Sequence, residues 1–313
     1  MIICTGGSGF IGSNLIRELN KKKIRNILIV DQKLKKPPKD LKYKSFISRE
    51  DFLKKINNSN FLSKIKFVYH LGANSSTSGK DINDYMVNNF LFSKKLIEKC
   101  IKHKIKIIYA SSASVYGTKT KNFKESTYPL YPENFYAISK AMVDYYVLGI
   151  LNKIPSSKII GLRYFNVYGP GESQKKNMAS VMYNFCKQIK KNNIIKLFKG
   201  SDGFEDGEQK RDFVHIDDCI KVNLWLTKNF KSGIYNVGTG KAESFNRVAN
   251  LIKKFLGNNK TKIKYVKISK DIADNYQSYT QANIIEIRKS GYNKNFIGIQ
   301  DGVISYVKKL SKK

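Results

Sequence analysis

The most constraining feature of this sequence is a cluster of glycines between a short apolar run and an amphipathic segment. The apolar run covers residues 1–5, and Gly6, Gly9 and Gly12 follow it with the spacing G-x-x-G-x-x-G. Residues 13–19 then carry apolar side chains at helical spacing. Glycine is needed where a backbone turns tightly or approaches another group without a Cβ in the way. The arrangement therefore predicts a strand, a tight turn and a helix, in that order.

A second feature of the same region indicates what this turn binds. Residues 27–31 form another apolar run, which ends on Asp31, about 20 residues beyond the glycine cluster. A helix that begins at a glycine-rich turn presents free backbone N–H groups and its positive dipole end to phosphates. An acidic residue at the end of the second strand is placed to accept a hydrogen bond from a ribose hydroxyl. The two features together predict a binding site for a dinucleotide.

Apolar strands and amphipathic helices continue to alternate along the N-terminal half of the chain. Residues 32–45 include Pro37 and Pro38 and indicate a surface loop. Alternation of strands and helices is typical of a parallel sheet covered by helices on both faces, so we predict an α/β fold with a doubly wound parallel sheet. The sequence predicts helices at residues 49–57, 84–100 and 134–151, and strands at residues 67–72, 106–110 and 158–165.

The pattern changes after Gly169-Pro170-Gly171, where shorter elements are expected to form a smaller C-terminal α/β lobe. At 313 residues the chain is long enough for two such parts. We expect residues 1–167, completed by parts of 213–240, to form the nucleotide-binding domain, and residues 168–313 to form mainly the substrate-binding lobe. The predicted elements of this lobe are helices at residues 178–191, 217–227, 284–290 and 299–309, and strands at residues 194–198, 233–237 and 263–268.

The net charge of +34 raises the question of a nucleic-acid partner. Only seven of the 58 basic residues are Arg, which leaves 51 Lys, and these are spread along the whole chain. Proteins that read nucleic acids rely on arginine for bidentate contacts with bases and phosphates. We therefore interpret the lysines as a solvated surface that attracts an anionic substrate, and we predict no nucleic-acid partner.

Other features point to a protein of the reducing cytoplasm. Apolar runs are too short to span a membrane, and the first residues already form a strand, so we expect neither a membrane segment nor a signal peptide. The cysteines lie far apart in the sequence and form no C-x-x-C pair, which indicates buried free thiols rather than disulfides or a metal site. They are Cys4, Cys100, Cys186 and Cys219.

Three polar side chains carry the predicted chemistry. Tyr136 and Lys140 are four residues apart in a predicted helix, so they lie on one face, one turn apart. A phenol has a pKa near ~10, and we expect the neighbouring ammonium to lower it, so that Tyr136 can take a proton from a substrate hydroxyl. Ser112 directly follows a predicted strand. Because ligands of open α/β sheets bind at the carboxyl ends of strands, its hydroxyl is placed to hold the reacting oxygen.

Together these features resemble the extended short-chain dehydrogenase/reductase superfamily. Within it, the chain is similar to the ADP-L-glycero-D-manno-heptose 6-epimerases, and the similarity runs essentially from end to end. The RYFNVYGP stretch occurs in many sugar-nucleotide enzymes, whereas GTGKAESF and YTQA are more particular to this family. The resemblance implies a Rossmann domain with a C-terminal substrate lobe. It rests on residues 163–170 (RYFNVYGP), 178–181 (MASV), 197–201 (LFKGS), 210–214 (KRDFV), 238–245 (GTGKAESF) and 276–282 (YQSYTQA).

The resemblance also implies roles for individual residues, matched by position. Catalytic positions are Ser112, Tyr136, Lys140 and, as a second acid/base, Lys175. Cofactor positions are Gly6, Gly9, Phe10, Ile11, Gly12, Asp31, Gln32, Lys39, Leu71, Gly72, Ala73, Asn74, Ser75, Asn88, Lys140, Val167 and Lys175. Substrate positions are Ser112, Asn166, Asn177, Asn184, Phe198, Lys199, Gly200, Ser201, Arg211 and Tyr276.

The cofactor and the assembly follow from the same resemblance. The family tends to use NADP, and the lysines at positions 33, 35, 36 and 39 could neutralise its 2′-phosphate, whereas Asp31 favours the free 2′-hydroxyl of NAD. We expect NADP, with NAD as the alternative, and a homo-oligomer. Asn177 and Asn184 replace a serine and a histidine that are common in the family, and the segment 202–210 is longer than usual. We expect these departures to affect which sugar the protein binds and to leave the reaction chemistry unchanged.

The expected reaction is the epimerisation of ADP-D-glycero-D-manno-heptose at C6″ by transient oxidation and re-reduction with a tightly bound nicotinamide cofactor. A UDP-hexose 4-epimerase-like enzyme or another sugar-nucleotide epimerase or dehydratase remains open. Ala113 and Ser114 stand where dehydratases of the superfamily have Asp-Glu, which argues against elimination. A non-catalytic NAD(P)-sensing protein is a third hypothesis, but such proteins typically lose the tyrosine or the lysine, and this chain has both.

Overall fold

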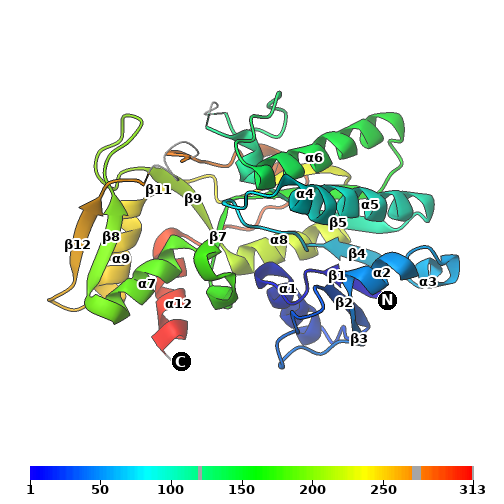
Figure 1. Ribbon diagram of the computed structural model, residues 1–313, viewed down its shortest axis with the longest axis horizontal. Coiled ribbons are helices and arrows are strands. Elements are labelled where there is room, and N and C mark those ends of the chain that lie inside the picture. Colours follow the sequence, from blue (N-terminus) through cyan, green and yellow to red (C-terminus); the bar gives the residue numbers. More distant parts are fainter. Residues whose placement is uncertain (119–121, 270–275, 312–313) are drawn as a thin grey trace. The chain divides into compact units, whose positions relative to one another are not determined.

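The computed structural model describes residues 1–118, 122–269 and 276–311, apart from the side chains of Gln174, Lys176, Asn177 and Ser311. The chain divides into two compact units, each assembled from separate stretches of sequence (Figure 1). Residues 116–133 belong to the second unit and residues 220–235 to the first. Unit 1 consists of Met1–Val115, Asn134–Arg163 and Ile220–Tyr235, and unit 2 of Tyr116–Glu133, Tyr164–Cys219 and Asn236–Lys313.

Unit 1 is built on a seven-stranded sheet with the order β10-β6-β5-β4-β1-β2-β3. The pairings of β1 with β2 and β4, of β2 with β3, and of β4 with β5 are parallel. This order confirms the predicted doubly wound α/β fold, in which the direction of strand order reverses between β1 and β4. The strands are β1 (Ile2–Thr5), β2 (Ile27–Asp31), β3 (Ser45–Ser48), β4 (Phe67–His70), β5 (Lys106–Ser112), β6 (Ile159–Tyr164) and β10 (Gly233–Val237).

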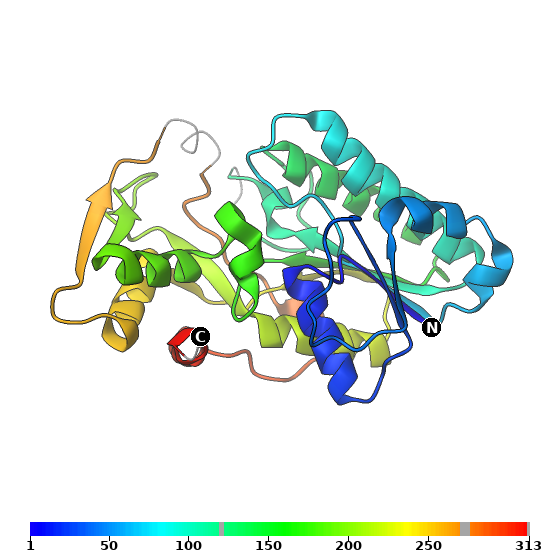
Figure 2. The ribbon, with the colours of Figure 1, turned by 60° about the horizontal axis from the view of Figure 1, so that its bottom comes forward.

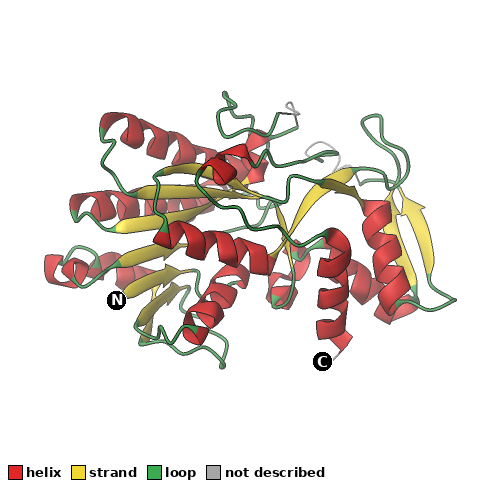
Figure 3. Cartoon of the chain, turned by 180° about the vertical axis from the view of Figure 1, so that it is seen from behind, coloured by secondary structure: helices red, strands yellow, loops and turns green. Residues whose placement is uncertain are grey.

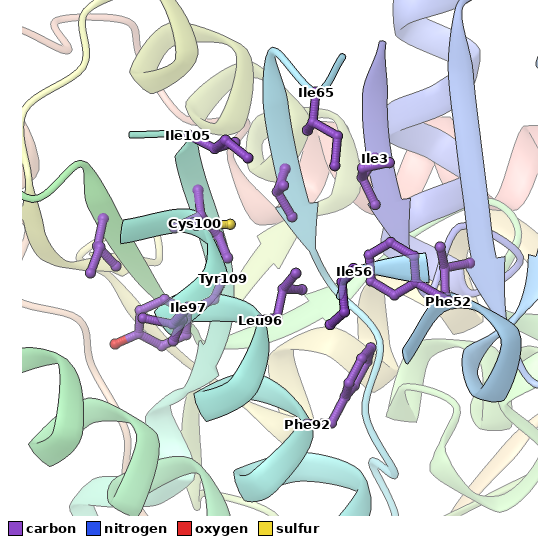
Figure 4. Packing of buried hydrophobic residues seen from close by; sticks show 14 of the residues in the cluster. Ile3, Phe52, Ile56, Ile65, Phe92, Leu96, Ile97, Cys100, Ile105 and Tyr109 are labelled. Carbon is purple, nitrogen blue, oxygen red and sulfur yellow. The ribbon is translucent and has the colours of Figure 1, made fainter. Parts of the chain in front are cut away.

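Helices cover both faces of this sheet (Figures 2 and 3). Helix α1 packs on one face, where the side chains of Ile16 in α1 and Ile29 in β2 both lie next to Gly7. Helix α8 packs on the same face and is bound to β4 by a 2.6 Å hydrogen bond between Tyr69 and Thr227. The other face is buried under α2, α5 and α6, whose apolar side chains form one cluster with β1, β4 and β5 (Figure 4). The helices are α1 (Phe10–Lys21), α2 (Arg49–Lys55), α3 (Ser59–Ser63), α4 (Ile82–Tyr85), α5 (Phe92–Lys102), α6 (Phe135–Lys153) and α8 (Ile216–Lys228).

Two details of unit 1 differ from the predicted elements. The predicted loop at residues 32–45 leads into a strand that was not predicted, β3 (Ser45–Ser48), which pairs in parallel with β2 at the sheet edge. The predicted helix at 84–100 is α4 and α5 separated by a π-helical turn at Met86–Leu91. Asn89 lies in this turn, fully buried, and its side chain donates to the carbonyl of Asn74 and to Ser139 Oγ, both at 2.9 Å. The π-helical geometry thus accommodates an inward-facing asparagine.

Unit 2 has two small sheets, of order β11-β9-β7 and β12-β8, and a separate core formed by α7, α9 and α12. Strands β7, β9 and β11 and helix α9 were absent from the predicted elements. Helix α9 buries Phe245, Val248, Ala249 and Ile252, which have ordinary helical spacing. The elements are β7 (Asn166–Tyr168), α7 (Val181–Asn192), β8 (Ile194–Phe198), β9 (Lys210–His215), β11 (Ala242–Ser244), α9 (Phe245–Leu256), β12 (Lys262–Val266), α11 (Ile285–Lys289) and α12 (Ile299–Ser311).

Two expectations from composition can be compared with the structure. The four cysteines are all buried and none of them forms a disulfide, as predicted. Within the described part of the chain, no helix combines the length and the apolar character that crossing a membrane requires.

Candidate active site

The glycine-rich turn lies where β1 meets the start of α1, next to the end of β4. Gly6 has a φ of +68°, and a Cβ on it would lie 2.6 Å from the Cα of Gly72. A Cβ on Gly12 would lie 2.3 Å from the carbonyl oxygen of Gly6. Both distances are far below van der Waals contact, so only glycine fits at these positions. The turn thereby brings backbone N–H groups to the point where strand order reverses, which is the ligand crevice of open α/β sheets.

Side chains around the turn tie the ends of β1 and β4 together. Thr5 Oγ1 lies 2.7 Å from His70 Nδ1 and accepts a 3.1 Å hydrogen bond from the amide of Gly72. Burial lowers the pKa of His70 to about 3, so its ring is neutral at physiological pH. His70 is therefore a structural hydrogen-bonding group rather than an acid/base.

Asp31 lies at the carboxyl end of β2, beside the turn. Its Oδ2 accepts a 3.0 Å hydrogen bond from the amide of Ser8, and its Oδ1 accepts a 2.9 Å bond from the amide of Gln32. The Oγ of Ser8 is buried and has no hydrogen-bond partner among the described residues. An orphaned hydroxyl in a turn that excludes side chains fits a bound pyrophosphate, which would supply the missing acceptor. The residues present thus fit a dinucleotide.

The loop after β4, residues 71–75, lies beside the π-helical turn. The amide of Asn74 donates to Asn89 Oδ1 at 2.7 Å, and the side chain of Asn88 is hydrogen-bonded to Asp84 and Arg49. Sequence reasoning missed Arg49. It follows β3 immediately, and Ser48 is in register with Asp31, so Arg49 lies at the same sheet edge as the cofactor positions. The available signal was a basic residue at a strand end, hidden because no strand was predicted between the loop at residues 32–45 and the helix at residues 49–57.

Ser112, Tyr136 and Lys140 come together in unit 1. Tyr136 and Ser112 are hydrogen-bonded through their side chains, and Lys140 Nζ lies 5.9 Å from the centroid of the Tyr136 ring. Lys140 Nζ also donates a 2.7 Å hydrogen bond to the carbonyl of Ala110 in β5. Helix α6 begins just before this group because Asn134 accepts from the amide of Ala137 at 2.9 Å and caps the helix. The predicted tyrosine, lysine and strand-end serine therefore form one cluster.

The electrostatics of this cluster correct one expectation. We predicted a lowered pKa for Tyr136, but burial raises it, and the hydrogen bond from Ser112 only opposes that shift. Burial lowers the pKa of Lys140 to about 8, against the opposing effect of the Asp144 carboxylate. Desolvation disfavours both charged forms, and it is the largest effect on the pKa of each group.

Unit 2 contains a buried arginine among aromatic rings. The guanidinium carbon of Arg211 lies 5.0 Å from the ring centroid of Tyr276 and 5.6 Å from that of Phe245. Tyr276 in turn packs edge-on against Phe198 at 5.6 Å. Among the described residues, no carboxylate forms an ion pair with Arg211, and burial lowers its pKa to about 10. A buried guanidinium with free donors and no counter-ion is suited to a phosphate.

Lys175 lies in unit 2 within the short helical turn Glu172–Met178, rather than in a longer helix. Glu172 is fully buried and links the residues on either side of this turn. It accepts hydrogen bonds from the amide of Gly169 at 3.2 Å and from the amide of Ser180 at 2.6 Å. Burial lowers the pKa of Lys175, and the charge of Glu172 opposes the shift. The loop therefore holds a half-buried lysine next to a fixed carboxylate.

The remaining predicted positions of unit 2 lie around its small sheets. Asn166 and Val167 belong to β7, Asn184 Nδ2 donates to the carbonyl of Ala179 at 3.3 Å, and Ser201 Oγ lies 3.0 Å from Ser278 Oγ. The long segment after Ser201 folds back on the 199–201 stretch. There the amide of Gly200 donates to Asp206 at 2.8 Å, and Gln209 donates to the carbonyl of Lys199 at 2.7 Å. The side chain of Asn177 lies outside the described part.

The sequence and the fold of this chain are similar to those of known proteins. Residues 2–238 match the NAD dependent epimerase/dehydratase family. The ADP-L-glycero-D-manno-heptose-6-epimerase of Helicobacter pylori is similar over 100% of this chain and 96% of its own, with 31% identity and a TM-score of 0.80. The UDP-glucose 4-epimerase of Thermotoga maritima is 26% identical, with coverage of 99% and 98% and a TM-score of 0.82. The UDP-glucuronic acid 4-epimerase of Bacillus cereus, whose structure contains a UDP-sugar and NAD, is also 26% identical, with coverage of 99% and 99% and a TM-score of 0.80. The chain therefore belongs to the NAD dependent epimerase/dehydratase family.

Proposed function

We propose that this protein epimerises ADP-D-glycero-D-manno-heptose to ADP-L-glycero-D-manno-heptose at C6″. The observation that carries the choice of sugar is the end-to-end similarity, at 31% identity, to the heptose epimerase of Helicobacter pylori. The cluster of Ser112, Tyr136 and Lys140 supports the chemistry, because a hydroxyl-bound phenol next to an ammonium suits proton exchange with a carbinol.

In this proposal the residues of unit 1 act on the oxygen of the reacting carbinol. Ser112 holds that oxygen, Tyr136 accepts its proton, and the Lys140 ammonium stabilises the phenolate that results. A nicotinamide cofactor held by the glycine-rich turn, by Asp31 and by residues 71–75 supplies reversible hydride transfer when bound. Lys175 is the second acid/base, which a two-face reaction requires because one phenol cannot serve both faces of the transient ketone.

The residues of unit 2 recognise the nucleotide in this proposal. The donors of Arg211 suit the diphosphate, which carries the negative charge that the buried guanidinium lacks in the protein. Phe198 and Tyr276 present aromatic rings beside it, against which a base can pack. These contacts select a nucleoside diphosphate sugar as the substrate class.

The direct test is incubation of the purified protein with ADP-D-glycero-D-manno-heptose, with proton NMR to distinguish the two C6″ epimers. We expect an equilibrium mixture of both epimers without added cofactor, because hydride is returned in every cycle. Parallel incubations with UDP-glucose and UDP-N-acetylglucosamine should leave these sugars unchanged.

A second candidate is a UDP-hexose 4-epimerase, and the similarity to the Thermotoga maritima enzyme favours it. Turnover of UDP-glucose with no reaction of the ADP-heptose would select this candidate and refute the first. Both candidates use Ser112, Tyr136 and Lys140, so they differ in the sugar and in the need for Lys175.

We further propose that the bound cofactor is NADP. Lys35 Nζ lies 3.7 Å from the position that a Cβ of Gly9 would take, so its ammonium faces the turn that holds the phosphates. Denatured, freshly purified protein is expected to release NADP, identified by mass spectrometry. The double variant Lys35→Glu, Lys39→Glu should shift the released nucleotide toward NAD, whereas Lys66→Glu, away from the turn, should not. Release of NAD alone by the parent protein would refute this choice.

We also propose that the protein is a homo-oligomer through the face made by α4, the π-helical turn and α6. Ile82, Val87, Leu91 and Tyr145 are exposed on these elements, and exposed apolar groups on adjacent elements mark association surfaces. Light scattering is expected to give a mass of at least twice 35.9 kDa. The variant Val87→Glu, Leu91→Glu should be monomeric, and a monomeric parent protein would contradict the proposal.

A further inference from the structure

Asp144 is a fully buried carboxylate in α6 whose hydrogen bonds reach two strands. Its Oδ1 accepts from Tyr109 Oη at 2.8 Å. Its Oδ2 accepts from Ser111 Oγ at 2.9 Å and from Arg163 Nε at 2.8 Å. Arg163 is fully buried as well, so the two form an ion pair out of contact with water. Neither residue is among the predicted site positions.

The position of Asp144 links it to the catalytic cluster. It follows Lys140 by one helical turn and Tyr136 by two, and therefore lies on the same face of α6. Lys140 Nζ donates to the carbonyl of Ala110, between the two β5 residues that Asp144 holds. Three successive residues of β5, at positions 109–111, are thus bound to α6 by side chains. The next residue is Ser112, whose hydroxyl bonds to Tyr136.

Stability alone is a weak explanation for this arrangement. Removing two charges from water costs several kcal/mol for each ion, and a buried ion pair can often be replaced by apolar residues without loss of stability. What a buried pair does provide is a single geometry, because every alternative leaves a charge or a donor unsatisfied. Here the pair fixes the position of residues 109–111 of β5 relative to helix α6.

We propose that Asp144, through its pairing with Arg163, is a positioning residue that fixes Ser112 against Tyr136. The inference rests on the proposed function only in assigning the chemistry to Ser112, Tyr136 and Lys140, and it is independent of which sugar is the substrate.

The charges around Lys140 determine how the site responds to pH. Tyr136 and Asp144 face it from its own helix, and His70, which is neutral, faces it from β4. Arg163 from β6 forms an ion pair with Asp144. If Asp144 loses its charge, Lys140 and Arg163 are left as two buried cations without a carboxylate. The pKa of Lys140, already lowered to about 8, must then fall further.

The test is the variant Asp144→Asn, measured as the pH dependence of kcat for epimerisation. We expect kcat to fall about 10- to 100-fold, with the KM of the sugar nucleotide unchanged because Arg211 and Tyr276 are untouched. The alkaline limb of the profile should move to lower pH. Hydrogen exchange followed by mass spectrometry should be faster at the amides of residues 109–112 and unchanged elsewhere in the sheet. The matched control is Asp218→Asn, another fully buried carboxylate, which accepts from the amide of Ile297 at 2.6 Å. It should leave the alkaline limb and the exchange of residues 109–112 unchanged.

Two milder variants keep the test decisive if Asp144→Asn does not fold. Tyr109→Phe and Ser111→Ala each remove one hydrogen bond to Asp144 without removing a charge, and each should lower kcat with KM unchanged. Parent kcat and exchange rates in all variants that fold would overturn the proposal. Loss of kcat in Tyr136→Phe together with parent behaviour in Asp144→Asn would refute the positioning role alone. An active Tyr136→Phe variant would instead refute the proposed function.

Discussion

Replacing Tyr136 by phenylalanine is expected to lower the rate of epimerisation by on the order of 10²–10⁴-fold. The variant loses only the phenol hydroxyl, which is hydrogen-bonded to Ser112 on a ring whose centroid lies 5.9 Å from Lys140 Nζ. Retention of the nicotinamide cofactor should be unaffected, because the glycine-rich turn and Asp31 are unchanged. The measurements are steady-state turnover of the sugar nucleotide and the nucleotide released on denaturation.

The matched control for this experiment is Tyr146→Phe in the same helix. Tyr146 Oη donates to Glu98 in α5 at 2.8 Å. Removal of that hydroxyl should leave turnover at the parent level. Normal turnover by a folded, cofactor-loaded Tyr136→Phe protein would show that the proton acceptor lies elsewhere.

Replacing Lys175 by methionine is expected to block full epimerisation, again by on the order of 10²–10⁴-fold, because the second acid/base is lost. Tyr136 remains, so oxidation of one of the two C6″ epimers should persist. Single-turnover formation of reduced nicotinamide, measured separately with each epimer, shows this asymmetry directly. A substrate analogue with an aldehyde at C6″ tests the same half-reaction from the other direction.

The neighbouring Lys176 provides the matched control. Lys176→Met is the same substitution and removes one lysine charge, one residue further along the chain. This variant should epimerise the sugar nucleotide at the parent rate. Loss of activity in Lys176→Met with a normal Lys175→Met variant would move the second acid/base by one position. Full activity in both variants would refute the two-base mechanism and favour a 4-epimerase in which Tyr136 acts alone.

Local sequence was sufficient for much of unit 1. The glycine-rich turn, Asp31 and the Tyr136–Lys140 pair depend on spacings of a few residues within one turn or one helix, and such spacings are visible in the sequence. The buried strands were equally visible, since both faces of a parallel sheet are covered and each strand is a continuous apolar run. The amphipathic pattern of α9 is visible in the sequence too, because its buried residues have ordinary helical spacing.

Tertiary structure decided the contacts between residues far apart in the chain. Arg211 meets Tyr276 across 65 positions, and Asp144 meets Tyr109 and Arg163 across 35 and 19. No sequence spacing encodes such pairs, because they depend on strand order and on which helix face turns inward. The same holds for pKa values. The spacing of Tyr136 and Lys140 predicted a lowered phenol pKa, but burial raises it. The sequence by itself indicated which groups are candidates for the chemistry, and only the folded chain decided their charge, because desolvation depends on everything packed around them.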